Sequence, residues 1–328
     1  MTSLKQHPPM RFVALAFVWA SVLLIPTFAP AQDWRVQVGA QSKDKALQVI
    51  AFLPNEIWIH AGDSIAFKVA TDEPHTVTFL TANQVVPPFS VGCPGSTPNG
   101  APEDGSNCVN SGTLTNGQSY SVTFPEPGDY KLICLYHQNH TAVIHVLDLS
   151  AQLPHEQAFY SAQAADMQRN LLSSADNMMD HDMRSSRPDV TAGTGSILAT
   201  GGGSNTLSIV RFMHPDKIVH VRETVEWTND DPITPHTITF GVEPANPMPP
   251  STNVTMDPDG ALHATVSSPK DNVHSGFIGA APQNQIGLPA PPAGITRFRV
   301  TFTRPGIFEY KCVLHDNLGM LGRVIVLP

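Results

Sequence analysis

Four side chains in the C-terminal half of the sequence have types and spacings that suit a metal ion. Cys312, His315 and Met320 are separated by two and four residues, and His236 lies far upstream after a proline. One tight loop between two strands can present the first three, while a distant strand presents the fourth. Two imidazoles and a thiolate in a plane, with a long weak thioether contact, are typical of a type 1 (blue) copper site. We therefore expect a copper ion that transfers electrons. Zinc is the alternative, and Met320 argues against it because zinc rarely uses a thioether.

A similar set occurs in the N-terminal half. His75 follows a proline, and Cys134 and His137 again stand three positions apart. The fifth residue after His137 is an alanine, which cannot bind a metal, and the loop is two residues shorter. His140 or Gln138 could approach the axial position, or the metal could have three ligands. We expect a second copper ion, with a different spectrum and reduction potential because the axial ligand tunes both.

Both sets lie in an internal repeat. Residues 122–137 align without a gap with residues 300–315, and the block 73–79 matches the block 234–240. The repeated segments are short, alternate in polarity, contain many β-branched residues and are separated by turn formers. Repeated short strands without helices between them predict one β-sandwich for each copy.

The order of these motifs resembles the plastocyanin branch of the cupredoxin family. The Pro-His pair at 235–236 is followed by a turn and by an aromatic-x-aromatic-x-Cys-x2-His-x4-Met segment from Phe308 to Met320. The resemblance covers nearly all of residues 205–328 and about residues 45–147. It implies an all-β fold of two Greek-key cupredoxin sandwiches and a function in one-electron transfer. It also implies that the histidine of each cysteine loop lies near the surface, where electrons enter or leave.

Two other functions remain as alternatives. Copper storage or delivery is suggested by the unusual N-terminal site and by a small cluster of Met178, Met179, His181 and Met183. A two-domain nitrite reductase or a laccase would place a histidine directly beside the type 1 cysteine. Neither Cys134 nor Cys312 has such a neighbour, and the sequence contains no His-x-His pair. We therefore expect an electron carrier rather than an enzyme, with a redox partner that the sequence does not identify.

The segment between the repeats has a different composition. We assign domain 1 to residues 32–148, a helical and flexible linker to 149–204, and domain 2 to 205–328. Residues 154–179 predict an amphipathic helix with a stripe at Ala158, Ala162, Ala165, Leu172, Ala175 and Met179. A helix of about 25 residues spans roughly 37 Å, so the two metals would be far apart unless the domains fold back together.

The N-terminus predicts export. Residues 1–31 combine Lys5 and Arg11, an apolar run and an Ala-Pro-Ala cleavage site before Gln32. A membrane anchor is the alternative, but the run is short and Pro26 interrupts it. We expect a periplasmic or secreted protein with no integral membrane segment after cleavage. The net charge of −9 and the absence of a basic cluster argue against nucleic-acid binding.

Two of the four cysteines are expected to form a disulfide. Cys93 and Cys108 enclose a loop rich in Pro, Gly, Asn and Ser, and an exported protein meets an oxidising environment. Closing a loop of about 15 residues stabilises a fold by roughly 3 kcal/mol in the chain-entropy model.

Overall fold

The computed structural model describes residues 31–84, 93, 96–137, 139–280 and 294–328. Residues 31–328 form one compact unit, whereas the predicted export signal lies, except for Ala31, outside the described residues. Within the described part of the chain, no helix is both long and apolar enough to cross a membrane.

The N-terminal half is a sandwich of two sheets. One contains β2 (Leu47–Leu53), β1 (Asp33–Gln41), β4 (Ser64–Val69), β8 (Ser119–Thr123) and β6 (Ala101–Pro102) in that order. The other contains β3 (Glu56–His60), β10 (Thr141–Leu147), β9 (Gly128–Ile133), β5 (Thr78–Phe79) and β7 (Val109–Asn110).

The C-terminal half repeats this arrangement. One sheet contains β12 (Gly203–Met213), β11 (Val190–Thr200), β14 (Thr224–Asp230), β19 (Arg297–Phe302), β17 (Leu262–Val266) and β16 (Thr255–Met256). The other contains β13 (Asp216–His220), β21 (Leu321–Leu327), β20 (Gly306–Lys311), β15 (Thr239–Phe240) and β18 (Val273–His274). The predicted fold class, all-β with two Greek-key sandwiches joined by a helical segment, is confirmed.

Alternation of apolar and polar residues explains the sandwich cores. Successive side chains of a strand point to opposite faces. In β4 the buried residues are Ile65, Phe67 and Val69, and in β14 they include Val225 and Trp227. These side chains belong to two separate hydrophobic cores, one in each half.

The two halves are joined edge to edge. β2 pairs antiparallel with β12, with Leu47 opposite Ile209 and Val49 opposite Leu207. The described strands of the two larger sheets therefore form a single sheet of 11 strands. The domains fold back together after all, because the partners in this pairing come from both halves of the chain.

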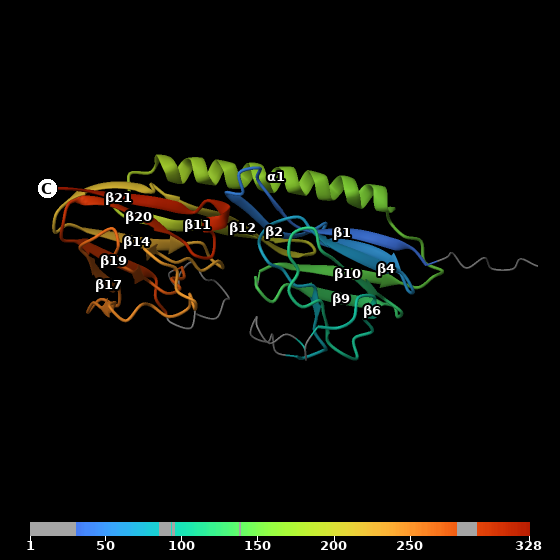
Figure 1. Cartoon of the computed structure of the whole chain (residues 1–328). Helices are drawn as coiled ribbons and strands as arrows, with labels where there is room; N and C mark the ends of the chain where they lie inside the picture. Colours follow the sequence, from blue (N-terminus) through green and yellow to red (C-terminus); the bar gives the residue numbers. More distant parts are fainter. Residues whose placement is uncertain (1–30, 85–92, 94–95, 138, 281–293) are drawn as a thin grey trace, which may run out of the picture. The chain divides into compact units, whose positions relative to one another are not determined.

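One helix covers this junction. Helix α1 (Gln157–Arg184) runs along the joining strands in Figure 1 and buries Leu171 and Ala175 in a third apolar cluster with β2 and β12. β2 is buried at every position because the sandwich core covers one face and the helix side covers the other. A strand with two covered faces is apolar nearly throughout.

The linker prediction was wrong for residues 190–204, which form β11 and the start of β12. The glycines and serines of this stretch suggested flexibility, but its first half is buried and its backbone pairs with β14. The predicted helix stripe was also partly wrong, because Ala158, Ala162 and Ala165 are exposed while Tyr160, Leu171 and Ala175 are buried. Alanine burial releases little free energy, so its spacing is a weak guide to the buried face.

Candidate metal centres

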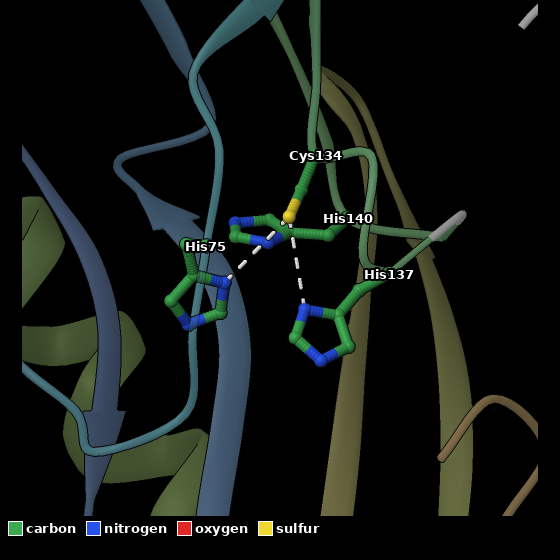
Figure 2. Close-up of side chains that lie close together, drawn as sticks. All are labelled: His75, Cys134, His137 and His140. Atoms are coloured by element: carbon green, nitrogen blue, oxygen red, sulfur yellow. Dashed lines mark hydrogen bonds between the residues drawn. The ribbon is translucent and has the colours of Figure 1, made fainter. Parts of the chain in front are cut away.

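In the N-terminal domain, four buried side chains converge on one point. The ligand atoms of His75, Cys134, His137 and His140 all lie within 4.8 Å of one another. Cys134 Sγ is 3.8 Å from His75 Nδ1 and 3.7 Å from His137 Nδ1. Figure 2 shows both Nδ1 atoms directed at the sulfur and the ring of His140 beside it. The other axial candidate, Gln138, lies outside the described residues.

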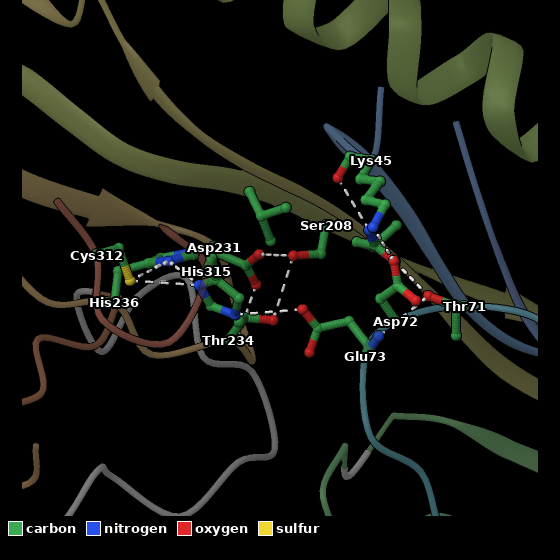
Figure 3. A network of polar contacts seen from close by, with 12 residues as sticks. Lys45, Thr71, Asp72, Glu73, Ser208, Asp231, Thr234, His236, Cys312 and His315 are labelled. Atoms are coloured by element: carbon green, nitrogen blue, oxygen red, sulfur yellow. Dashed lines mark hydrogen bonds and ion pairs between the residues drawn. The ribbon is translucent and has the colours of Figure 1, made fainter. Parts of the chain in front are cut away.

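In the C-terminal domain, His236, Cys312 and His315 converge in the same way. Cys312 Sγ is 3.8 Å from His236 Nδ1 and 3.4 Å from His315 Nδ1, and the two nitrogens are 3.1 Å apart (Figure 3). Met320 is fully buried in the same core. Its carbonyl accepts the Cys312 N–H, and its own N–H donates to the His315 carbonyl.

These separations fit a single metal ion among the three equatorial atoms. Metal–nitrogen distances of about 2.0 Å and metal–sulfur distances of about 2.3 Å give a ligand spacing of roughly 3.7 Å in a trigonal plane. The sulfur–nitrogen distances in the two domains run from 3.4 to 3.8 Å. The residues present therefore fit the trigonal copper site that their types predict.

A threonine after each upstream histidine fixes the cysteine loop. Thr76 donates its N–H to Cys134 Sγ over 3.3 Å, and its hydroxyl accepts the N–H of Leu135. Thr237 makes the same two contacts with Cys312 and Val313. Both domains thus hold the thiolate position with a backbone donor and with a hydroxyl that restrains the next residue.

A glycine packs against the ring of each upstream histidine. Gly39 in β1 and Gly193 in β11 occupy equivalent bulges, with φ of +71° and +80°. A Cβ atom would lie 3.0 Å from His75 Nε2 at the first position and 2.1 Å from His236 Nε2 at the second. Only glycine adopts this backbone readily and leaves room for the ring. The sequence analysis missed both, although their equivalent places in the repeat were a usable signal.

Burial favours the metal-binding form of three imidazoles. It lowers the pKa of His75, His140 and His236 well below the ordinary value, so each ring is neutral and offers a lone pair. The two cysteines differ in the direction of their pKa shift. Burial raises the pKa of Cys134, whereas His315 more than offsets burial at Cys312 and lowers its pKa.

Glu73 is a buried carboxylate between the two sites that the sequence analysis also missed. Its oxygens lie 3.3 Å from His315 Nε2 and 4.0 Å from His137 Nε2. Burial acts to lower the pKa of His315, but Cys312 and Glu73 raise it to about 10. Burial lowers the pKa of His137 to about 4 in spite of Glu73. In the repeat, Glu73 aligns with Thr234, and this difference between the copies was the available signal.

The expected surface position of the loop histidines is wrong. His137 and His315 are only 5% and 3% exposed, because each faces Glu73 where the two domains meet. Neither imidazole edge is therefore open to solvent, contrary to what the family resemblance implied.

The remaining sequence expectations have separate outcomes. The disulfide between Cys93 and Cys108 is confirmed. Another histidine of the N-terminal domain, His145, lies outside the N-terminal cluster, stacks on Trp58 and pairs with Asp129. In the Met/His cluster of α1, Met178 and Met179 pack on the third apolar cluster, whereas His181 is exposed.

Comparison with known proteins gives a family for the N-terminal domain. The family model described as copper binding proteins, plastocyanin/azurin family, matches residues 36–147. A reduced amicyanin variant aligns with 38% of this chain and 96% of its own, with 18% identity and a TM-score of 0.24. Amicyanin from Paracoccus versutus (Thiobacillus versutus) aligns with 36% and 85%, with 22% identity and a TM-score of 0.24. Among curated protein sequences, none matches the chain.

The N-terminal domain therefore belongs to the plastocyanin/azurin family of copper-binding proteins, and the predicted resemblance to cupredoxins is confirmed. The C-terminal domain has the equivalent strand order and the same Cys-x2-His spacing. The two domains thus share one strand order and one spacing of candidate ligands.

Proposed function

We propose that this protein is an exported one-electron carrier with one type 1 copper ion in each domain. In the C-terminal centre, His236, Cys312 and His315 are the equatorial ligands and Met320 is the axial ligand. In the N-terminal centre, His75, Cys134 and His137 take the equatorial positions and His140 is the fourth ligand. Copper bound in this way cycles between Cu(I) and Cu(II).

One observation carries the proposal. Each domain brings two imidazole Nδ1 atoms to within 3.4–3.8 Å of a buried cysteine sulfur. The threonine and glycine contacts hold these groups in place before any ion binds, which favours a fixed geometry in both oxidation states. Such preorganisation supports electron transfer more than storage, which requires ligands that release copper.

The test is to load the mature protein with Cu(II), count copper ions per chain and record visible and paramagnetic resonance spectra. We expect two copper ions and two distinct type 1 signals. Cys312→Ser should remove the C-terminal signal alone, and Cys134→Ser the N-terminal signal alone. Exchangeable copper without a reversible redox wave would favour storage instead, and turnover of nitrite or a phenol would favour an enzyme.

The proposed export has its own measurement. The N-terminal sequence of the protein recovered from the periplasm or the medium should begin at Gln32. An intact N-terminus on protein that remains with the membrane fraction would support the anchor alternative.

A further inference from the structure

The two candidate copper centres face each other through one carboxylate. In each centre the loop histidine directs Nδ1 toward the cysteine, so its Nε2 is directed away from the metal position. His137 Nε2 lies 4.0 Å from Glu73 Oε2, and His315 Nε2 lies 3.3 Å from Glu73 Oε1. Figure 3 shows Glu73 beside His315, within the polar network that leads to Cys312.

All three side chains are buried. Glu73, His137 and His315 belong to the buried residues of the described chain. A buried carboxylate is costly unless it is paired and hydrogen-bonded. A metal-bound histidine commonly donates its other ring N–H to a carboxylate. With Nδ1 on a metal ion, each imidazole would carry its proton on Nε2, which faces the same carboxylate at 3.3 Å in His315 and at 4.0 Å in His137.

The repeat shows that a site of this kind is built without an acid at the equivalent position. Glu73 aligns with Thr234, and both precede a Pro-His-Thr sequence. Thr234 is bonded locally: its carbonyl accepts from Asn229, and its hydroxyl lies 3.2 Å from that of Ser208. The C-terminal site is thus built with a threonine at this position. The carboxylate in the N-terminal copy serves a purpose that spans the two domains.

We propose that Glu73 bridges the two candidate copper centres through its ion-pair contacts with His315 and His137, and that electrons pass between the domains along this path. This inference rests on the proposed function. With copper in both centres, the electron given up by one centre would be accepted by the other. No covalent bond forms or breaks, and both Nε2 protons remain on their rings. The carboxylate divides the path between the two rings into contacts of 3.3 Å and 4.0 Å.

The bridge gives a reason for the burial of both loop histidines. Because each imidazole edge faces Glu73 rather than solvent, the two centres exchange electrons with each other. The different fourth ligands, His140 and Met320, would give the two centres different potentials and the transfer a direction.

The test uses the two-copper holoprotein of wild type, Glu73→Gln and Asp72→Asn. Rapid one-electron reduction is followed by the absorbance of the two copper bands as the electron redistributes within the molecule. Glutamine keeps the size but not the charge, and its amide group cannot accept from both rings. We expect the intramolecular rate to fall at least tenfold in Glu73→Gln. Asp72→Asn is the matched control because Asp72 pairs with Lys45 and not with either imidazole.

A second readout separates bridging from a merely structural role. Removal of a negative charge that faces both centres should raise both reduction potentials. Lost packing would instead lower the free energy of unfolding without shifting both potentials. Glu73→Asp, which keeps the charge and shortens the side chain, should retain both potentials but slow the transfer. Two normal copper signals with an unchanged rate in Glu73→Gln would overturn the bridge alone. A wild-type protein without two type 1 signals would overturn the proposed function first.

Discussion

Gly39 and Gly193 lie against the upstream histidines of the two candidate copper centres without being ligands themselves. Each makes a bulge in the strand beneath the upstream histidine, and each has a positive φ. At Gly193 a Cβ atom would lie 2.1 Å from His236 Nε2, and at Gly39 it would lie 2.3 Å from Thr71 Cγ2 and 3.0 Å from His75 Nε2. The lack of a Cβ atom at each glycine therefore leaves room for the imidazole ring.

Gly193→Ala should disable the C-terminal centre selectively. The new methyl group would lie 2.1 Å from His236 Nε2, so the ring must move. The matched control is Gly62→Ala, where φ is +93° and no atom lies within 4 Å. The control should lose only about 1–2 kcal/mol of unfolding free energy from backbone strain and keep both copper signals. Equal spectra in the two variants would contradict a packing role for Gly193.

His140→Met should make the N-terminal centre resemble the C-terminal one. His140 is buried among the other three candidate ligands, and the axial ligand tunes both spectrum and potential. A thioether favours Cu(I), so we expect the N-terminal potential to rise towards that of the C-terminal centre. Cyclic voltammetry and paramagnetic resonance of the Cys312→Ser background would measure this without overlap. His145→Met is the control, and a response there equal to that of His140→Met would disprove the assignment.

At the scale of elements, α1 and the β2–β12 pairing do more than connect the domains. Leu171 and Ala175 cover the strands that join the two halves. Leu171→Ala should therefore lower the free energy of unfolding by roughly 2–4 kcal/mol, as expected for a truncated core leucine. Ala162→Ser, on the exposed face, should stay within about 0.5 kcal/mol of wild type. Urea denaturation measures the free energy of unfolding of both variants. A larger loss in Ala162→Ser than in Leu171→Ala would mean that the alanine stripe is the buried face of the helix.

The edge between β6 and β8 carries a buried acid that should make stability depend on pH. Glu103 Oε1 accepts the N–H of Gly105, whereas Oε2 is buried and finds no donor among the described residues. Burial raises the pKa of Glu103 from 4.5 to about 7. Because the folded state holds this proton more tightly, the associated stability is complete below pH 4.5 and is lost as pH rises through 7.

Glu103→Gln removes this titration. We expect the variant and wild type to have similar melting temperatures at pH 4.5 and the variant to melt higher at pH 8. Melting curves across this range give the comparison. If the wild type instead gained stability relative to the variant between pH 4.5 and pH 8, the pKa of Glu103 would not be raised in the folded state.

A strand or a ligand could be predicted where its sequence pattern lies within one short segment. The Cys-x2-His spacing, the alternation in β4 and the Cys93–Cys108 loop are all contained in short segments. The β2–β12 junction is not, because Leu47 and Leu207 are 160 positions apart and resemble any other buried strand residues. β11 was missed for a related reason, since its glycines mark a bulge and close packing rather than flexibility. Glu73 was detectable only as a difference between the two copies.

At the scale of the whole molecule, the strand order is close to a mirror image about the junction. Reading outwards, β2-β1-β4-β8-β6 on one side corresponds to β12-β11-β14-β19-β17 on the other. The two domains meet through equivalent strands, in the manner of an isologous dimer held within one chain. The carboxylate of Glu73 breaks this symmetry, because only one copy has it.

The shared sheet, the helix over it and the buried bridge predict that the two domains unfold as one unit. Copper bound to one centre should then stabilise both. In Cys312→Ser, where only the N-terminal centre keeps its thiolate, free copper at about 1,000 times the dissociation constant adds about 4 kcal/mol. For a unit of about 300 residues this raises the melting temperature by roughly 6 °C. Differential scanning calorimetry should show a single transition that moves as a whole. Two transitions, of which copper shifts only one, would mean that the junction joins the domains without coupling their stability.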